Sequence, residues 1–210
     1  MPTRFRCWAM LTRLLILGCL LAAPLHGKAT EDMFDLREII ASPTPQQYSV
    51  CLDHSCATIV TDALSDNEWR EVTAPLRPPP GGAADERAAI GRSMALFETV
   101  VGRHTGTSGD RGRNAAGFGQ PGQLDCIDES TNTTTYLKLL DGDGLLRYHR
   151  VAGRATRFGL FVGMPHSTAV IEDLDSGSRY VVDSWFYDNG QPPHIVRLKD
   201  WYAGQDPVDD

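Results

Sequence analysis

The sequence lacks an apolar run long enough to cross a bilayer. Its longest run extends from Leu14 to Ala23 and is ended by Pro24, whereas a transmembrane helix needs about 20 apolar residues. A short apolar run after a basic N-terminus is typical of a secretory signal peptide, and the basic residues are Arg4, Arg6 and Arg13. We therefore expect residues 1–29 to be a signal peptide and the protein to be periplasmic or secreted.

Small residues at Gly27 and Ala29 occupy the positions that signal peptidase reads, so we expect cleavage near Ala29. Cys19 lies in a weak lipobox, but the apolar run continues beyond it, which favours simple secretion over lipidation. An uncleaved anchor is the remaining alternative, and the interruption by Arg13 argues against it. After cleavage, no stable membrane insertion is expected.

Basic residues are scarce. The chain has 20 Lys and Arg against 27 Asp and Glu, a formal net charge of −7. Removing residues 1–29 deletes four basic residues and no acidic one, which leaves 16 against 27 and a net charge of −11. Nucleic acids and anionic membrane surfaces would repel such a chain, so we expect neither as a partner.

Internal repeats are absent, and the one biased stretch is Pro/Gly-rich, at residues 78–82. About 180 residues remain after the expected cleavage, enough for one domain with a sizeable core. We assign residues 30–84 to an N-terminal helical region with the Pro/Gly linker. Residues 85–210 form the rest of the same domain and carry the candidate site.

Three cysteines remain after the signal peptide: Cys51, Cys56 and Cys126. Thiols that can pair in an oxidising compartment tend to do so, and the close spacing of Cys51 and Cys56 predicts a small disulfide loop. An alternative assigns this pair, with His54, to a metal, but the spacing is not a standard zinc pattern. Cys126 is then unpaired, either as a small buried hydrophobic residue or as a reactive thiol.

The first half of the chain predicts helices on either side of strand-like residues. Weak helical spacing at residues 33–40 precedes the strand-like residues 48–60. A capping box formed by Ser65 and Glu68 predicts the start of the next helix. A third helix ends at Gly102 and has its apolar residues on one face, which predicts core packing: Ile90, Met94, Phe97 and Val101.

The second half predicts a loop, a helix and an antiparallel sheet. Residues 105–122 are rich in Gly, Ser and Asp and lack periodicity, which favours a functional loop, here as the wall of a substrate cleft. A helix from Cys126 to Leu140 places the thiol in or just before the first turn. We expect strands at 146–156, 167–172 and 179–186, with a fourth candidate at 195–198. The fold class is therefore α+β, with N-terminal helices on an antiparallel sheet and the Cys-bearing helix against it.

The last two long strands form a hairpin. If its turn centres between Asp175 and Ser176, Asp183 lies opposite Thr168, and His166 is the diagonal neighbour of Asp183 on the same face. Diagonal pairs lie about 7–8 Å apart between backbones, within reach of an imidazole and a carboxylate. Apolar neighbours on both strands predict burial, so Asp183 needs a partner.

These residue types suit nucleophilic catalysis. A thiol attacks poorly until it ionises, and a helix N-terminus with a nearby imidazolium favours the thiolate. Cys126 would be the nucleophile and His166 its base, while Asp183 would hold the tautomer of the ring. Each has a structural alternative, since a lone His in a strand is more often structural. Trp185 and Phe186 are more typical of core than of cleft lining.

Two segments, QLDCIDESTNTTTYLKLL and PHSTAVIEDLDSGSRYVVDSWF, resemble the transglutaminase-like, papain-like superfamily of cysteine enzymes. The nearest similarity is to the bacterial transglutaminase-like cysteine proteinases, periplasmic enzymes that clip surface adhesins. Exported proteobacterial proteins with the same DCIDE, PHSTAVI and VDSWF segments are similar over most of the mature length. The resemblance implies a papain/transglutaminase-like core at residues 85–210, with Cys126, His166 and Asp183 at the catalytic positions.

The chain departs from this family around the cysteine. The adhesin-clipping enzymes resemble one another in having calcium-binding acids there. Here Asp125 precedes the cysteine, but Ile127 follows it and acids return only at Asp128 and Glu129. Asp125 and Asp128 are therefore weak calcium candidates beside a simpler role as acids favoured by a helix N-terminus. No other cofactor is expected.

A second departure lies beside the histidine, where transglutaminases carry an aromatic residue and this chain has Ser167. This difference argues against cross-linking activity. The oxyanion of an acyl intermediate needs hydrogen-bond donors, and the backbone N–H of Cys126 is one candidate. A glutamine supplies another in papain-like enzymes, which the resemblance assigns to Gln123 or, second, to Gln120.

The sequence thus predicts an exported cysteine hydrolase that cleaves an amide bond through a thioester intermediate. A protein or peptide of the cell envelope is the expected substrate. A transglutaminase or other acyltransferase would use the same three residues with an amine in place of water. A non-catalytic envelope protein that keeps the fold for binding is the alternative from a different class.

Overall fold

The computed structural model describes residues 39–114, 117, 119–158 and 165–208. The elements in chain order are β1 (Tyr48–Leu52), β2 (Thr58–Asp62), α1 (Asp66–Thr73), η1 (Ala74–Leu76), α2 (Ala83–Thr105), α3 (Cys126–Gly142), β3 (His149–Phe158), β4 (Pro165–Asp173), β5 (Arg179–Val182), η2 (Ser184–Phe186) and α4 (Leu198–Tyr202). The predicted α+β class is confirmed. The predicted signal peptide, and most of the helix expected at 33–40, lie outside the described residues.

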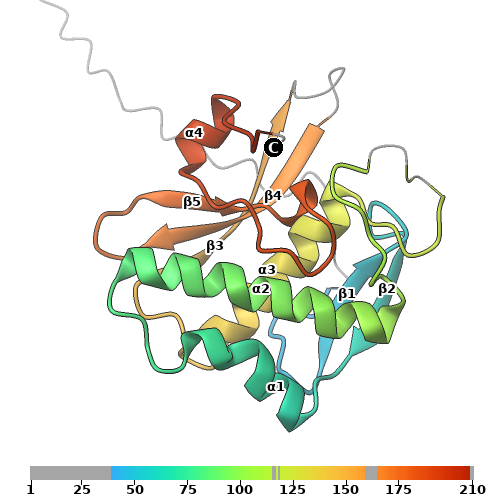
Figure 1. The fold of residues 1–210 in the computed structure, drawn as a ribbon, viewed down its shortest axis with the longest axis horizontal. Coiled ribbons are helices and arrows are strands. Elements are labelled where there is room, and N and C mark those ends of the chain that lie inside the picture. The colour runs from blue at the N-terminus through green and yellow to red at the C-terminus, as the bar shows by residue number, and fades with distance from the viewer. Residues whose placement is uncertain (1–38, 115–116, 118, 159–164, 209–210) are drawn as a thin grey trace, which may run out of the picture.

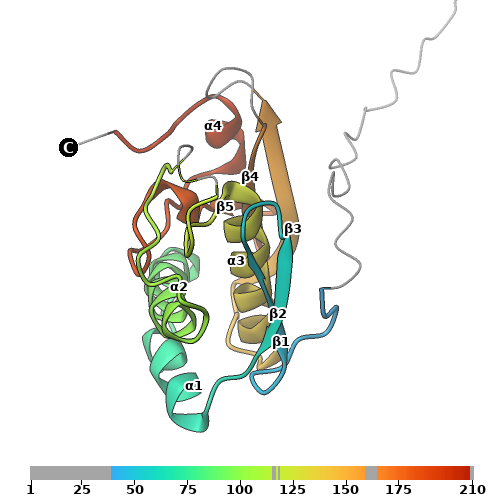
Figure 2. The same cartoon turned by 90° about the vertical axis from the view of Figure 1, so that its right-hand side faces the viewer.

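Helix α3 occupies the centre of the fold. It packs against β1 of the first sheet and against β3 and β4 of the second, and α2 lies on its other side (Figures 1 and 2). Because neighbours cover nearly every face of α3, most of its side chains are buried, polar ones included. The Cys-bearing helix therefore lies against the sheets, as the sequence predicts.

Both sheets are antiparallel. β1 and β2 form a hairpin, and the second sheet has the strand order β3-β4-β5. In this sheet Ala169 lies opposite Val182, which is the register that the hairpin turn predicts. The fourth strand expected at 195–198 is wrong: the segment makes a single bridge at Arg197 and then enters α4. Two prolines precede this segment and cannot donate to a ladder, which limits pairing there.

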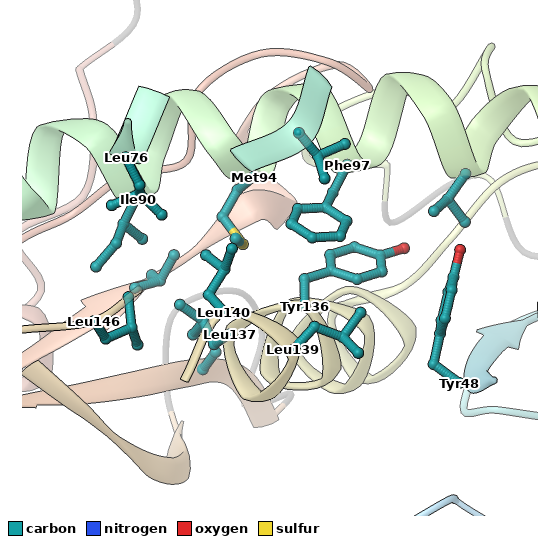
Figure 3. Packing of buried hydrophobic residues seen from close by; sticks show 14 of the residues in the cluster. Tyr48, Leu76, Ile90, Met94, Phe97, Tyr136, Leu137, Leu139, Leu140 and Leu146 are labelled. Atoms are coloured by element: carbon teal, nitrogen blue, oxygen red, sulfur yellow. The ribbon is translucent and has the colours of Figure 1, made fainter. Parts of the chain in front are cut away.

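One hydrophobic core joins the two halves of the chain (Figure 3). Phe97 of α2 stacks on Tyr136 of α3 with 4.8 Å between ring centroids, and Tyr48 of β1 adds an edge contact to Tyr136. The face predicted for α2 is buried throughout: Ile90, Met94, Phe97 and Val101. Each side chain of this size contributes about 1.5–3 kcal/mol when buried, so the core holds α3 firmly between α2 and the sheets.

Helix α3 begins at a capping box. Oδ1 of Asp125 accepts the N–H groups of Ile127 and Asp128, at 2.9 and 3.0 Å. The threonines that follow lower helix propensity, but their hydroxyls bond back to the preceding turn, as Thr131 does to the Ile127 carbonyl at 2.7 Å. Tertiary contacts on every side then outweigh the low propensity.

The loop between α2 and α3 is anchored on the turn after β5. A Cβ at Gly112 would lie 2.6 Å from the carbonyl oxygen of Phe186, so only glycine allows this approach. Arg111 pairs with Asp188 at 2.9 Å, and the Gly112 N–H donates to the same carboxylate at 3.0 Å. Across the described ranges, no helix has both the length and the apolar character needed to span a membrane.

Candidate active site

Cys126 is the first residue of α3 and is half-buried. Its Sγ lies 3.9 Å from the carbonyl oxygen of Pro165, at the start of β4. Cys51 and Cys56 form the predicted disulfide, so Cys126 is the free cysteine of the described chain. The disulfide overturns the alternative of a metal bound by Cys51 and Cys56, because only a thiolate is a good sulfur ligand.

His166 follows Pro165 on β4 and lies between a carboxylate and the thiol. Its Nε2 is 2.8 Å from Oδ2 of Asp183, and the ring also hydrogen-bonds to Cys126. Because Nε2 is bound to the carboxylate, Nδ1 is the nitrogen available to the sulfur. The structure thus brings together the three residues that the sequence predicts to act together.

The surroundings of His166 favour its protonated ring. Burial alone lowers the pKa of His166, but the charge and the hydrogen bond of Asp183, with further contributions from Cys126, raise this pKa to about 9. At neutral pH the ring is therefore an imidazolium, the form that stabilises a neighbouring thiolate.

Asp183 lies just beyond β5 and is 1 % exposed. Besides His166, its Oδ2 accepts the indole N–H of Trp201 at 2.9 Å. Its backbone is held by a two-way bridge to His194, at 3.0 and 2.9 Å. The buried carboxylate therefore has the partners that its burial requires, and Trp201 is one that the sequence analysis did not select.

Aromatic rings surround the His166 imidazole. The ring centroids of Trp185, Phe186 and Trp201 lie 4.8, 5.4 and 5.7 Å from it. Phe186 and Trp201 are buried, whereas Trp185 is half-buried. The core position expected for Phe186 is confirmed, but Trp185 both covers the imidazole and presents surface at the site.

The two acids considered for calcium anchor the disulfide loop. Residues 53–56 have φ between 53° and 65°, a run of four left-handed residues, and three of their N–H groups donate to the first turn of α3. The bonds run from His54 and Cys56 to Asp128, at 2.8 and 2.7 Å, and from Ser55 to Asp125, at 2.9 Å. The acids at the start of α3 therefore accept hydrogen bonds from three backbone N–H groups of this loop and hold it in place.

All four carboxylate oxygens of Asp125 and Asp128 accept hydrogen bonds from the protein. A carboxylate that ligates calcium presents its oxygens to the ion instead, so this donor set does not fit a calcium site. Burial and the charge of Asp125 raise the pKa of Asp128 to about 6, against the lowering effect of its backbone bonds.

Gln123, the first candidate for an oxyanion donor, is bound within its own loop. Its Nε2 donates to the Gly109 carbonyl at 2.9 Å, and its Oε1 accepts from the Asn114 amide. Use of this nitrogen for an oxyanion therefore requires exchange of the bond to Gly109. Gln120 is exposed. Both assignments stay predictions.

Three buried acids lie behind the first turns of α3, and nothing in their local sequence distinguishes them from surface charges. They are Glu98 of α2, Asp110 of the loop and Glu129 of α3. Burial raises the pKa of each, that of Glu98 to about 7. A side-chain hydrogen bond between Glu129 and Asp110 adds to the rise in the pKa of Glu129, and Asp110 also accepts the Leu124 N–H at 2.8 Å. Asp110 therefore links the segment just before Cys126 to Glu129 of α3.

Comparison with known proteins gave no match: no family model, no curated protein and no solved structure matches this chain.

Proposed function

We propose that this protein is an exported cysteine hydrolase in which Cys126 attacks an amide carbonyl. The observation that carries the proposal is a chain of contacts from a free thiol at the start of α3, through an imidazole with a pKa of about 9, to a buried carboxylate 2.8 Å from that ring. One ring nitrogen is held by the acid, which leaves the other for proton transfer at the sulfur.

The proposed reaction has two halves. The Cys126 thiolate attacks the acyl carbon, and its own backbone N–H at the helix start is a candidate donor to the oxyanion, since Asp125 takes the next two N–H groups instead. His166 gives its Nδ1 proton to the leaving amine, and a thioester remains. Water then attacks the thioester and gives a proton to Nδ1, and the acid product leaves as the thiolate and imidazolium are restored. Asp183 holds Nε2 throughout.

A papain/transglutaminase-like core at residues 85–210 is part of the proposal. It is supported by the central helix that carries the thiol and by the antiparallel sheet that carries His166, with Asp183 next to its last strand. The disulfide and the expected signal peptide favour a periplasmic or secreted enzyme, so a protein or peptide of the cell envelope is the proposed substrate.

Labelling with iodoacetamide, followed by mass spectrometry, tests the nucleophile. At pH 6.5 we expect Cys126 to react about tenfold faster than free cysteine, and His166→Ala to remove this advantage. His104→Ala is the matched control, since His104 bonds to Asp62 and Glu68 instead of the site, and it should leave the rate unchanged. A wild-type rate equal to that of free cysteine would reject the proposal and favour a non-catalytic binding protein.

A separate measurement identifies the acyl acceptor, which is water in a hydrolase and an amine in an acyltransferase. Comparing cleaved envelope proteins between wild type and Cys126→Ala should reveal new N-termini that depend on the thiol. Addition of a labelled primary amine distinguishes hydrolysis from acyl transfer, because only an acyltransferase would attach the amine to the substrate. We expect cleavage without attachment.

A further inference from the structure

The indole of Trp201 is a second donor to the carboxylate that holds His166. Trp201 is fully buried, and its Nε1 lies 2.9 Å from Oδ2 of Asp183. The same oxygen lies 2.8 Å from Nε2 of His166. An indole N–H can only donate, so this bond keeps its direction whether or not His166 carries a second proton. Two donors on one oxygen restrict rotation of the carboxylate.

Trp201 sits in a small hydrophobic cluster on the face of the sheet turned away from α3. Its neighbours there include Val170 of β4 and Val181 of β5. The adjacent residues Ala169 and Val182 belong to the main core instead, as alternation along a strand requires. Burial alone would be satisfied by any large apolar side chain, so packing does not account for the bond to Asp183.

Arg157 of β3 also contacts the indole of Trp201. It pairs with His166 in the strand register, and its guanidinium carbon lies 4.2 Å from the centroid of the Trp201 ring. The guanidinium also donates to the Trp201 carbonyl and to the Asp206 carboxylate. A cation that is only 5 % exposed is costly unless it is paired. Asp206 supplies that pairing from the chain segment after α4.

We propose that Trp201 is a positioning residue for the Asp183–His166 pair, and that Arg157 holds Trp201 in place. This inference rests on the proposed function, because it assigns these residues to the geometry of that site. Trp201 aims the carboxylate at Nε2 and excludes water from the bond between them. Arg157, through its stacking and its link to Asp206, ties the end of the chain to the strand beside His166.

The variant Trp201→Phe tests the role of the N–H, since it keeps a large buried ring and removes the donor. We expect the pKa of His166, followed by NMR of its ring, to fall by about one unit, because the carboxylate loses a fixed orientation. Labelling of Cys126 at pH 6.5 should slow by about three- to tenfold. Arg157→Lys, which keeps the charge but not the planar stack, should give a smaller change in the same direction. Tyr202→Phe, an exposed position on the same helix, should change neither quantity.

An unchanged or raised pKa of His166 in folded Trp201→Phe would overturn the positioning role. If that variant does not fold, the indole N–H resonance of Trp201 in the wild-type protein replaces it. We expect this resonance to shift as His166 titrates and to move in Asp183→Asn. A resonance that stays unchanged in both experiments would overturn the proposal. These NMR measurements need no activity. An unreactive Cys126 combined with a lowered His166 pKa in Trp201→Phe would therefore reject the hydrolase while leaving the positioning role intact.

Discussion

In the part of the chain that the structure describes, two buried pairs join a histidine to a carboxylate, one with its histidine on β4 and the other with its histidine on β3. In the first, Nε2 of His166 lies 2.8 Å from Asp183. In the second, Nδ1 of His149 lies 2.9 Å from Oε1 of Glu86, and both side chains are fully buried. Distance and burial alone therefore do not distinguish the two pairs.

The group at the second nitrogen of each imidazole distinguishes the two pairs. Nε2 of His149 lies 3.2 Å from the guanidinium of Arg87, and because a guanidinium can only donate, this nitrogen is occupied as an acceptor. Glu86 also accepts the N–H groups of Arg147 and Tyr148, at 2.7 and 3.0 Å. This pair fixes the start of β3 to α2. The second nitrogen of His166 meets the Cys126 thiol instead, a group with which it can exchange a proton. A histidine–carboxylate pair can act in proton transfer only where the ring nitrogen that does not face the carboxylate meets a reacting group.

The largest expected effect separates the pairs by activity. His166→Ala should lower the rate of the thiol-dependent cleavage by about 10²- to 10⁴-fold, the usual contribution of a general acid–base group. His149→Ala should leave the rate per folded molecule unchanged. Rates are normalised to folded protein by circular dichroism. Equal losses in the two variants would show that both histidines act only through the fold.

The second effect separates the pairs by stability. Glu86→Ala leaves two backbone N–H groups and the His149 ring without their buried acceptor, so we expect a loss of about 3 kcal/mol or more in the free energy of unfolding. Urea denaturation measures this loss. Glu71→Ala, on the exposed side of α1, is the control and should change little. A loss below about 1 kcal/mol for Glu86→Ala would contradict the structural role.

The third effect concerns the β1–β2 hairpin, which carries the Cys51–Cys56 disulfide. This hairpin contacts α3, which carries Cys126, and not the Glu86–His149 pair. Asn132 of α3 binds both the N–H and the carbonyl of Cys51, at 2.7 and 2.9 Å. Replacing Cys51 and Cys56 by Ser should cost about 2 kcal/mol of stability, as expected for a short closed loop, and should slow labelling of Cys126. Unchanged labelling in the folded double variant would show that the hairpin does not support the site.

The smallest expected effect is the pH dependence of the free energy of unfolding, which arises from groups near the Cys126 end of α3. The pKa of Glu98 in the folded protein, about 7, is above its ordinary value of 4.5, so its contribution to stability is complete below about pH 4.5 and is lost as the pH rises through 7. His166, raised from 6.5 to about 9, acts in the same direction between those values. Stability should therefore fall from pH 5 to pH 9. Glu98→Gln removes the titrating group, so it should flatten this slope and stabilise the protein by about 1–2 kcal/mol at pH 8. Urea denaturation measures the change, and an unchanged slope would contradict the raised pKa of Glu98.

Local patterns predicted much of the site. The turn residues at Asp175 and Ser176 were sufficient for the β4–β5 register. The helix expected from Cys126 to Leu140 is α3, in which Cys126 is the first residue. The disulfide followed from spacing and compartment. These features depend on neighbours in the chain, where turn chemistry and capping act.

The features that the sequence did not reveal depend on tertiary contacts. Trp201 reaches Asp183 from a separate helix, and no periodicity links the two residues. Glu98 and Glu129 resemble ordinary surface charges on their helices until packing buries them. The segment expected as a strand at 195–198 also depends on tertiary packing: Val196 and Leu198 pack against the cluster around Trp201, and the segment meets β5 at an isolated bridge instead of a continuous ladder.

The pH dependence of Cys126 alkylation tests the pairing of Cys126 with His166 most directly. Between pH 4 and pH 10, the wild-type rate should already be high at pH 6 and should change again near pH 9, where His166 loses its second proton. In His166→Ala the step near pH 9 should disappear and the rate at pH 6 should fall. A wild-type profile with one rise near pH 8.5, as for a free thiol, and the same profile in His166→Ala would contradict a catalytic pair.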